Sequence, residues 1–497
     1  MKLIFRKYIF PAMLSTLVLA GCSDDLDVKP YDGLTFDQTT NTPEGLKAAT
    51  IGNYSYLKDS YYTRNYHMLT EYASDNVALS GTTTDPLFYA YNYQHLTSMS
   101  ITTNFFRKAY QAVYGTNVVI EKLKEGQSAD LDQILGENYF LRAMVHFDLV
   151  NVFGRPYAQD QGASLGIMIR DNTDINDLPP RSTVKQTYEF ILRDLEKAAQ
   201  LMGSTKNSSF ASKEVAYALL SRVHLFMENN EKAIEYANMV INSNRYALVS
   251  TADLPKYFSF ANESNKETIF AIKHTIQDDR GWASLGSMYL SDGMGYGEMY
   301  ASASYRNLVD KFPDDKRREF IVPVYLRNAD GSIRTGADGK PLLAARNGYE
   351  KYFITKYSYQ EGVVTLSSPV YLRLAEMYLN RAEANAKLGN QAAALEDVNL
   401  IRQRSGLSGD ALFSPSNMMG YTSVLDVVLD ERRLELAWEA HRKFDVFRNN
   451  RTMVRNYPGT HLPSGQTTQE IPYTHPRVVF FIPEEEIILN PNLVQNP

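Results

Sequence analysis

The sequence is poor in the side chains that form disulfides and metal clusters. Its 497 residues include one cysteine, Cys22, which excludes an intrachain disulfide, a zinc ribbon and a cysteine-bound iron–sulfur cluster. The eight histidines are scattered, and no two stand at a spacing common among metal ligands. The sequence therefore predicts no metal site and no cofactor.

Basic charge and common catalytic motifs are also scarce. The 51 basic side chains are outnumbered by 57 acidic ones, whereas a nucleic-acid groove needs clustered Lys and Arg to displace counterions. There is no Gly-Lys-Ser/Thr phosphate loop and no His-Glu-x-x-His helix. Tyrosine, by contrast, is abundant, with 34 residues, although tryptophan occurs only twice. This composition argues against a nucleic-acid partner.

The N-terminal residues are expected to be a secretory signal. Three basic side chains precede an apolar stretch, residues 9–20, that is shorter than the roughly 20 residues a membrane-spanning helix needs. Leu19-Ala20-Gly21-Cys22 then resembles a bacterial lipobox, in which cleavage leaves a lipid-modified cysteine at the N-terminus. The alternative is an ordinary signal peptide that ends near a buried cysteine. The lipobox interpretation makes residues 1–21 the signal peptide and anchors the protein to a membrane through Cys22.

Amphipathic helices are predicted over much of the remaining chain. Between Asp130 and Phe153, apolar residues fall on two stripes with helical spacing, which is typical of a helix sandwiched between neighbours. Thr183, with Gln186 three residues later, predicts a capping box that opens a helix ending near Leu201.

Two later segments are similar to each other. Residues 216–241 and 377–402 align without gaps at an offset of 161 positions, and each pattern predicts two antiparallel helices joined by a short polar turn. Such pairs resemble tetratricopeptide repeats, which stack on one another to bury a continuous core.

Residues 243–370 lack a helical period. A strand is expected at 267–273, and hairpin turns are expected at Asp330-Gly331 and Asp338-Gly339. The segment 281–305 is rich in Gly, Ser, Tyr and Met. Long irregular loops in compact domains are usually functional or disordered, and the aromatic content argues against disorder. This segment is therefore a candidate ligand-binding region.

An acidic series, Glu431, Glu435 and Glu439, recurs every four residues and allows two interpretations. Glu431 and Glu435 could be the acid and base of a glycoside hydrolase. Alternatively, with arginines such as Arg432 and Arg433 nearby, the series could form an ion-paired helix face that holds neighbouring helices in register. The second interpretation is favoured, because carboxylates on successive turns stand only about 6 Å apart at Cβ and have arginines at hand.

Clusters of tyrosine point to a sugar-binding surface. Sugar rings offer C–H faces that stack on aromatic rings, and their hydroxyls need polar partners, so aromatic rings edged by polar residues meet both needs. For any single tyrosine, packing in the core is the more common role. The candidate residues lie near two loop regions, one after Glu71–Asn76 and one at 281–305: Arg64, Asp75, Tyr89, Tyr91, Asn92, Tyr93, Trp282, Tyr289, Tyr296 and Tyr300.

Motifs spread along the chain resemble one family. They are Glu137–Ala143 with Phe153–Pro156, Arg193–Ala198, Leu372–Ala384, Asp430–Arg433 with Asp445, and Ile482–Glu484 with Asn490–Pro497. In this order, and together with the lipobox, they resemble the SusD/RagB family of outer-membrane nutrient-binding lipoproteins. The shared motifs are scaffold residues, so the resemblance carries over no ligand contact.

The resemblance implies a mainly α-helical fold of tetratricopeptide-like pairs, with a loop-rich ligand-binding region and a few short strands. We divide the chain into the signal peptide 1–21, a helical region 22–242, the loop-rich region 243–370 and a helical region 371–497. The family binds oligosaccharides, and some members bind peptides; they do not cleave them. The resemblance thus implies a surface-exposed lipoprotein of the outer membrane, not an enzyme, that delivers its ligand to a TonB-dependent transporter of the SusC type.

Overall fold

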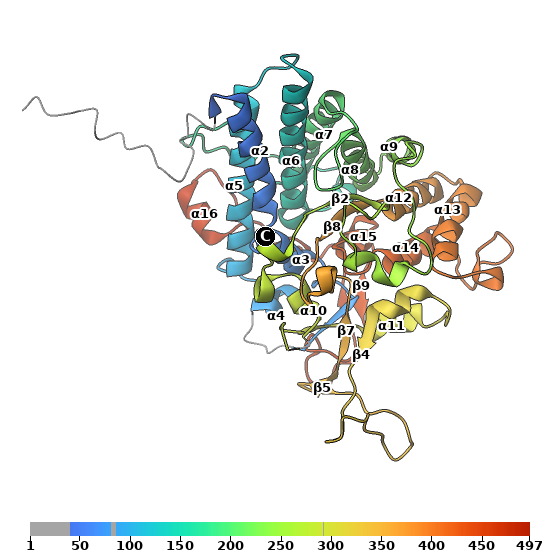
Figure 1. Ribbon diagram of the computed structural model, residues 1–497. Helices are drawn as coiled ribbons and strands as arrows, with labels where there is room; N and C mark the ends of the chain where they lie inside the picture. Colours follow the sequence, from blue (N-terminus) through green and yellow to red (C-terminus); the bar gives the residue numbers. More distant parts are fainter. Residues whose placement is uncertain (1–39, 81–85, 292) are drawn as a thin grey trace, which may run out of the picture.

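The computed structural model describes residues 40–80, 86–291 and 293–497, which form a mainly helical protein with five two-stranded sheets (Figure 1). The predicted signal peptide and Cys22 lie outside the described residues. Within the described ranges, no helix combines the length and apolar character needed to cross a bilayer.

The helices are bounded as follows: α2 Pro43–Leu57, α3 Thr63–Thr70, α4 Pro86–Tyr91, α5 Ser100–Lys122, α6 Ala129–Phe153, α7 Val184–Leu201, α8 Lys213–Phe226, α9 Asn230–Ile241, α10 Gly286–Tyr289, α11 Ala303–Val309, α12 Leu374–Lys387, α13 Gln391–Arg404, α14 Val424–Glu435, α15 Arg442–Arg448 and α16 Glu484–Leu489. The strands are β1 Val77–Leu79, β2 Thr268–Ala271, β3 Met299–Ala301, β4 Ile321–Pro323, β5 Ala345–Arg346, β6 Tyr349–Glu350, β7 Tyr352–Ile354, β8 Val370–Arg373, β9 Met453–Arg455 and β10 Gln469–Ile471.

The long helices begin where the sequence supplies caps. Thr183 and Gln186 form the predicted capping box, and α7 ends at Leu201 as expected. The hydroxyl of Ser128 accepts a hydrogen bond from the backbone N–H of Leu131 at the start of α6. Local side-chain chemistry therefore sets both helix starts.

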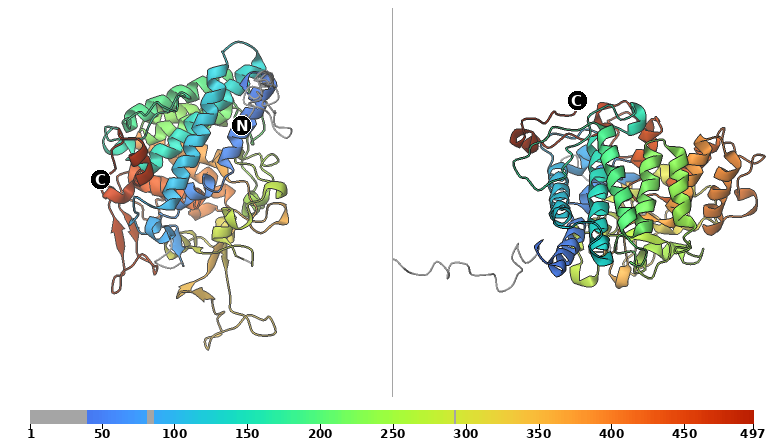
Figure 2. Two further views of the ribbon diagram at one scale, coloured as in Figure 1. Left: turned by 90° about the vertical axis from the view of Figure 1, so that its left-hand side faces the viewer. Right: turned by 90° about the horizontal axis from the view of Figure 1, so that it is seen from above.

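The helices stack side by side in one continuous array. Successive contacts run from α2 and α5 through α6, α7, α8 and α9 to α12, α13 and α14, an order visible in the right-hand view of Figure 2. The two similar segments form the predicted pairs, α8 with α9 and α12 with α13, and the pairs meet where α9 packs on α12. Arg381 on α12 donates to the Asn238 amide on α9 at 2.6 Å. The predicted helix pairing is confirmed.

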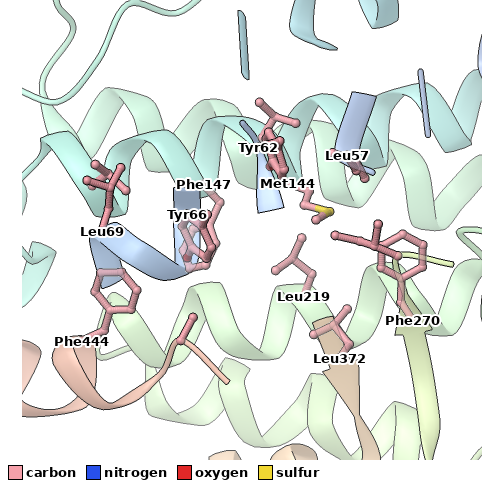
Figure 3. Close-up of a cluster of buried hydrophobic side chains, with 14 of the residues drawn as sticks. Leu57, Tyr62, Tyr66, Leu69, Met144, Phe147, Leu219, Phe270, Leu372 and Phe444 are labelled. Atoms are coloured by element: carbon pink, nitrogen blue, oxygen red, sulfur yellow. The ribbon is translucent and has the colours of Figure 1, made fainter. Parts of the chain in front are cut away.

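The main core lies between these helices and the irregular region. Helix α6 is buried on almost every side from Leu135 to Phe153, as its two apolar stripes predicted. Side chains from helices and strands along most of the described chain meet there, and ten of them are labelled in Figure 3: Leu57, Tyr62, Tyr66, Leu69, Met144, Phe147, Leu219, Phe270, Leu372 and Phe444.

The segment between α9 and α12 lies largely below the helical array in Figure 1. Strand β2 occupies the predicted position, and Gly331 and Gly339 adopt the positive φ of the predicted Asp-Gly turns. Strand β3 pairs antiparallel with β1, so that Val77 faces Ala301 across the sheet. This pairing joins the segment around residue 300 to the N-terminal helices and positions the site described next.

Candidate functional site

A pocket of about 360 Å³ opens where α3 and the start of α5 meet the segment 288–298. Both polar and apolar side chains line it: Tyr61, Arg64, Asn65, Met68, Leu87, Ser100, Ile101, Asn104, Met288, Tyr296 and Glu298. These residues come from four separate stretches of the chain, which the β1–β3 pairing and the packing of α3 on α5 bring together.

Two exposed aromatic side chains lie at the edge of this pocket: Tyr296 lines it, and Trp282, which is not among the lining residues, contacts Tyr296. Trp282 is 52% exposed and Tyr296 is 46% exposed, and their ring centroids lie 5.1 Å apart in an edge-to-face arrangement. The hydroxyl of Ser287 donates to the backbone carbonyl of Trp282 at 2.7 Å, which fixes the turn that carries the indole. Half-exposed rings held on a fixed backbone offer a preformed apolar surface to a ligand.

Polar groups edge this aromatic pair. The Nη1 atom of Arg64 lies 3.5 Å from the backbone carbonyl oxygen of Trp282. Glu298 accepts from Arg346 at 3.0 Å, and the amide of Asn65 donates to the Ile101 carbonyl at 3.2 Å. Donors and acceptors beside an apolar face suit a hydroxyl-rich ligand.

Two of the residues expected from the sequence, Arg64 and Tyr296, line the pocket, and a third, Trp282, contacts Tyr296 at its edge. It adds Tyr61 and Asn104, which the sequence analysis did not select. Tyr61 belongs to a run of closely spaced tyrosines in the sequence, and that run was the available signal. Asn104 lies inside a helical pattern, where nothing local distinguishes it.

The other two tyrosines of the 281–305 segment lie inside the protein. Tyr289 is fully buried, and its ring packs on Tyr72 and Tyr357 at centroid distances of 5.5 and 5.7 Å. Tyr300 lies on β3 and packs on Phe353. Their rings therefore fill the core and offer no face to a ligand, so neither belongs to the pocket.

The residues around α4 are placed in the same way. Tyr91, Asn92 and Tyr93 are buried, and the guanidinium of Arg455 lies over the rings of Tyr91 and Tyr93. The Tyr93 hydroxyl donates to a backbone carbonyl at 2.5 Å. Tyr89 is half-buried against Phe88 and is not among the residues that line the pocket. We remove these four residues from the site, because Tyr91, Asn92 and Tyr93 are buried and Tyr89 does not line the pocket.

Asp75 is a scaffold residue. Its carboxylate accepts from Arg442 at 2.7 and 3.0 Å, and it pairs with Arg433 at 3.3 Å. Burial alone would raise the pKa of Asp75, but the two arginines hold it well below the ordinary value. With both carboxylate oxygens engaged, Asp75 has no free acceptor for a ligand.

The acidic series is an ion-paired element of the scaffold, as favoured from the sequence. Glu431 pairs with Arg317 at 2.6 Å and with Arg402 at 2.9 Å, and Glu435 pairs with Arg373 and Arg404. All six of these side chains are buried.

The details of the series differ from the sequence-based expectation in two ways. Helix α14 ends at Glu435, so Glu439 lies beyond it, where it pairs with Arg373 and Lys356 at 2.7 Å each. The adjacent Arg432 turns away and pairs with Asp445 instead. The partners come from distant elements because neighbours in one helix point to different sides.

These contacts do not suit the carboxylates for hydrolysis. Burial raises the pKa of Glu435, but Arg404, Arg373 and Arg317 outweigh that effect and hold it below the ordinary value. A general acid instead needs a raised pKa and access to the substrate. Glu435 therefore lacks both properties of a general acid, and Glu431, buried against Arg317 and Arg402, lacks access to a substrate.

Two further kinds of catalytic site lack the required context in the described part of the chain. Gly162–Gly166 has the Gly-x-Ser-x-Gly spacing, but it lies in the loop between α6 and α7, where Asp160 accepts from the Ser164 backbone N–H. It therefore lacks the strand–turn–helix context of a nucleophile elbow. No three acidic, His or Cys side chains of the described residues are grouped so that they could hold a metal ion.

A second opening of about 510 Å³ lies between α5, the loop before α7 and α16. Its lining is richer in aliphatic side chains, including Met168, Ile175, Leu178 and Leu489. Such a groove suits an apolar partner better than a hydroxyl-rich ligand. The pocket beside Trp282 is therefore the candidate ligand site.

Comparison with known proteins agrees with this architecture. Residues 261–497 match the model of the SusD family, and residues 24–225 match a family described as "Starch-binding associating with outer membrane". The chain is 26% identical to the SusD-like protein P38 of Formosa agariphila, over 98% of this chain and 97% of that protein.

Solved structures show the same fold. A SusD superfamily protein from Bacteroides thetaiotaomicron has a TM-score of 0.78 and 27% identity, covering 91% of this chain and 99% of the other. One from Bacteroides vulgatus has a TM-score of 0.76 and 28% identity, covering 91% and 98%. With the helical array, the scaffold ion pairs and these matches in agreement, the chain belongs to the SusD/RagB family.

Proposed function

We propose that this protein is a surface-exposed lipoprotein of the outer membrane that binds oligosaccharides or polysaccharide and delivers them to a TonB-dependent transporter of the SusC type. Binding occurs in the pocket beside Trp282, and the protein cleaves nothing. The lipid on Cys22 holds the protein at the membrane, where it raises the local concentration of ligand and closes over the mouth of the transporter barrel.

One observation carries the ligand assignment. Trp282 and Tyr296 expose about half of each ring beside a pocket whose other walls carry Tyr61, Arg64 and Asn104. Aromatic faces bind the C–H surface of a sugar ring, and the amide and guanidinium groups bind its hydroxyls. The description of the matching N-terminal family as starch-binding supports the same class of ligand.

Membrane placement rests on two separate supports. The lipobox around Cys22 predicts lipid attachment, and the matching family is described as associating with the outer membrane. Metabolic labelling with a radioactive fatty acid tests the anchor: the wild type should carry label in the outer-membrane fraction, whereas Cys22→Ser should carry none. Label in both proteins, or in neither, would contradict the anchor.

A glycan array set against a peptide library tests the ligand class. We expect binding to glycans only, whereas binding to peptides alone would replace the proposed ligand while leaving the scaffold assignment intact. Each glycan bound is then incubated with the protein, and reducing ends are measured. Their release, and its loss in Glu435→Gln, would show the glycosidase activity that the buried ion pairs argue against.

Delivery is tested by isolating the protein from detergent-solubilised outer membranes. A TonB-dependent barrel should co-purify with it, and the barrel gene is expected beside its own gene. Isolation without any barrel, together with uptake unaffected by deletion of the protein, would refute the transport role but not glycan binding.

A further inference from the structure

A smaller hollow shares Arg64 with the pocket beside Trp282. Three basic side chains, Lys58, Arg64 and Arg280, line it together with His274 and Asp279. Arg64 lines both openings and therefore connects them. The short helical turn Gly281–Ala283 sets Arg280 and Ala283 on the hollow, while Trp282 between them packs on Tyr296.

The positive charge in this hollow is only partly neutralised. Lys58 forms a salt bridge with Asp278, and the Asp279 carboxylate accepts from the Gly281 backbone N–H at 3.0 Å. Neither Arg64 nor Arg280 has an ion-pair partner among the described residues. In the part of the chain that the structure describes, the Trp282 carbonyl is the one hydrogen-bond partner of Arg64. Two guanidinium groups are thus left to a ligand at the edge of the aromatic pair.

The neighbouring titratable groups respond to this charge. Burial lowers the pKa of Lys58, and Arg280 and Lys273 lower it further. Burial, Lys58 and Arg280 lower the pKa of His274 to about 4, so the imidazole is neutral at pH 7. The positive charges that lower these two pKa values also attract a negative charge, so the hollow is electrostatically suited to an anion.

We infer that the glycan bound here is anionic, with a carboxylate or sulfate group held between Arg64 and Arg280 while its sugar rings lie across Trp282, Tyr296 and Tyr61. This inference rests on the proposed function. The planar guanidinium fork matches the oxygen geometry of carboxylate and sulfate, and charge-assisted hydrogen bonds of this kind are stronger than neutral ones. The exposed aromatic pair and the two free arginines would then recognise adjoining parts of one ligand.

Affinity gel electrophoresis with matched polysaccharides tests the inference on the full chain. The charged probes are polygalacturonate and alginate, which carry carboxylates, and κ-carrageenan, which carries sulfate. The neutral probes are fully methyl-esterified pectin, desulfated carrageenan and starch. We expect retardation by at least one charged probe, little by its neutral counterpart, and weakening as NaCl rises from 50 to 300 mM by screening. The preferred probe identifies carboxylate or sulfate.

Variants test whether binding of the charged probe depends on the two arginines of the hollow. Arg280→Gln and Arg64→Gln should each weaken binding of the charged probe roughly ten- to hundredfold, the usual loss for one charge-assisted hydrogen bond. Arg327→Gln, an exposed arginine on the projecting segment near β4, should leave it unchanged. Trp282→Ala should weaken binding of every probe that the wild type binds.

The outcomes separate the inference from the proposed function. Equal retardation by charged and neutral probes, with no change in binding by Arg280→Gln, would overturn the anionic ligand and leave glycan binding in place. Retardation by neutral probes alone would also overturn the anionic ligand and leave glycan binding in place. Retardation by no polysaccharide would overturn the glycan-binding function and this inference with it.

Discussion

The chain has two tryptophans, and they lie in regions of opposite character. Trp438 is fully buried: its backbone N–H donates to Glu71 at 3.1 Å and its ring packs on Tyr305 at 4.5 Å. Trp282 is 52% exposed and contacts Tyr296 at the edge of a pocket. The first holds elements together, whereas the second presents a ring to solvent.

The charged groups around the two tryptophans differ in the same way. Near Trp438, Glu435 and Glu439 share Arg373, and each carboxylate is buried and ion-paired. Near Trp282, Arg64 and Arg280 have no carboxylate partner among the described residues. A dense cluster of charge thus marks the scaffold here, while the candidate site is marked by groups that the fold leaves incompletely satisfied.

Removing a buried carboxylate from the scaffold should cause the largest change in stability. Glu435→Ala leaves Arg373 and Arg404 buried without one of their partners, and we expect a loss of about 3–5 kcal/mol in the free energy of unfolding. Urea denaturation measures it. The matched control is Glu319→Ala, which breaks an exposed pair with Lys316 and should change stability by no more than about 0.5 kcal/mol.

A small effect of Glu435→Ala on stability would contradict the scaffold role of the ion pairs, because it would mean that the buried network contributes little to folding. Glycan affinity of the protein that remains folded gives an independent check. It should equal that of the wild type, since Glu435 is not among the residues that line the pocket.

Lowering the pH should destabilise the ion-paired scaffold without changing glycan affinity at the pocket. The pKa values of Glu435 and Asp75 lie below their ordinary values, because burial, which raises them, is outweighed by Arg404 and Arg373 in one case and by Arg433 and Arg442 in the other. Their contribution to stability is complete above the unfolded values of about 4 to 4.5, and it is lost as pH falls towards the folded values.

Urea midpoints measured from pH 7 down to pH 3 should therefore fall, and Glu435→Gln should flatten the slope. Glycan affinity should stay constant between pH 7 and pH 5, because an arginine and aromatic rings carry no group that titrates there. A midpoint that is the same at pH 7 and pH 3 would contradict the stabilising role of the ion pairs.

The sequence predicted the scaffold well because its signals are local. A capping box, a helical apolar period and an Asp-Gly turn each depend on a few consecutive residues, and Thr183, Gln186 and Gly331 behave in the structure as expected. The ion-paired role of Glu431 was also predicted, although its partners Arg317 and Arg402 were not. They come from distant elements that local patterns do not connect.

The site was predicted only in part, because burial of a tyrosine is decided by tertiary contacts. Tyr289 and Tyr296 lie seven residues apart in one irregular segment, yet one packs on Tyr72 and Tyr357 while the other faces solvent. No period in the segment distinguishes them. Asn104 joins the pocket only because α5 packs on α3, which depends on the whole fold.

Trp282→Ala tests the exposed side of the comparison, with a smaller expected effect. Loss of the stacking face should weaken glycan binding by about 1–2 kcal/mol, or roughly five- to thirtyfold. The free energy of unfolding should change by no more than about 0.5 kcal/mol, because half of the side chain is already exposed. Isothermal titration calorimetry and urea denaturation give the two values.

The other tryptophan supplies the control. Trp438→Ala should cost about 3–5 kcal/mol of stability through the cavity it leaves. Unchanged glycan affinity in Trp282→Ala would remove the aromatic pair from the site, whatever the effect of Trp438→Ala.

The smallest effects are expected at two adjacent tyrosines, one of which lines the pocket while the other lies in the core. Tyr61 is 47% exposed and lines the pocket, whereas Tyr62 is buried and its hydroxyl donates to Asp148 at 2.7 Å. Tyr62→Phe should lower the free energy of unfolding by about 1 kcal/mol and leave glycan affinity unchanged, because it removes one buried hydrogen bond. Tyr61→Phe keeps the ring, so neither stability nor affinity should change by more than about 0.5 kcal/mol. A tenfold loss of affinity in Tyr61→Phe would instead show that the hydroxyl binds the ligand, and the pocket would then act through polar contacts more than through its aromatic faces.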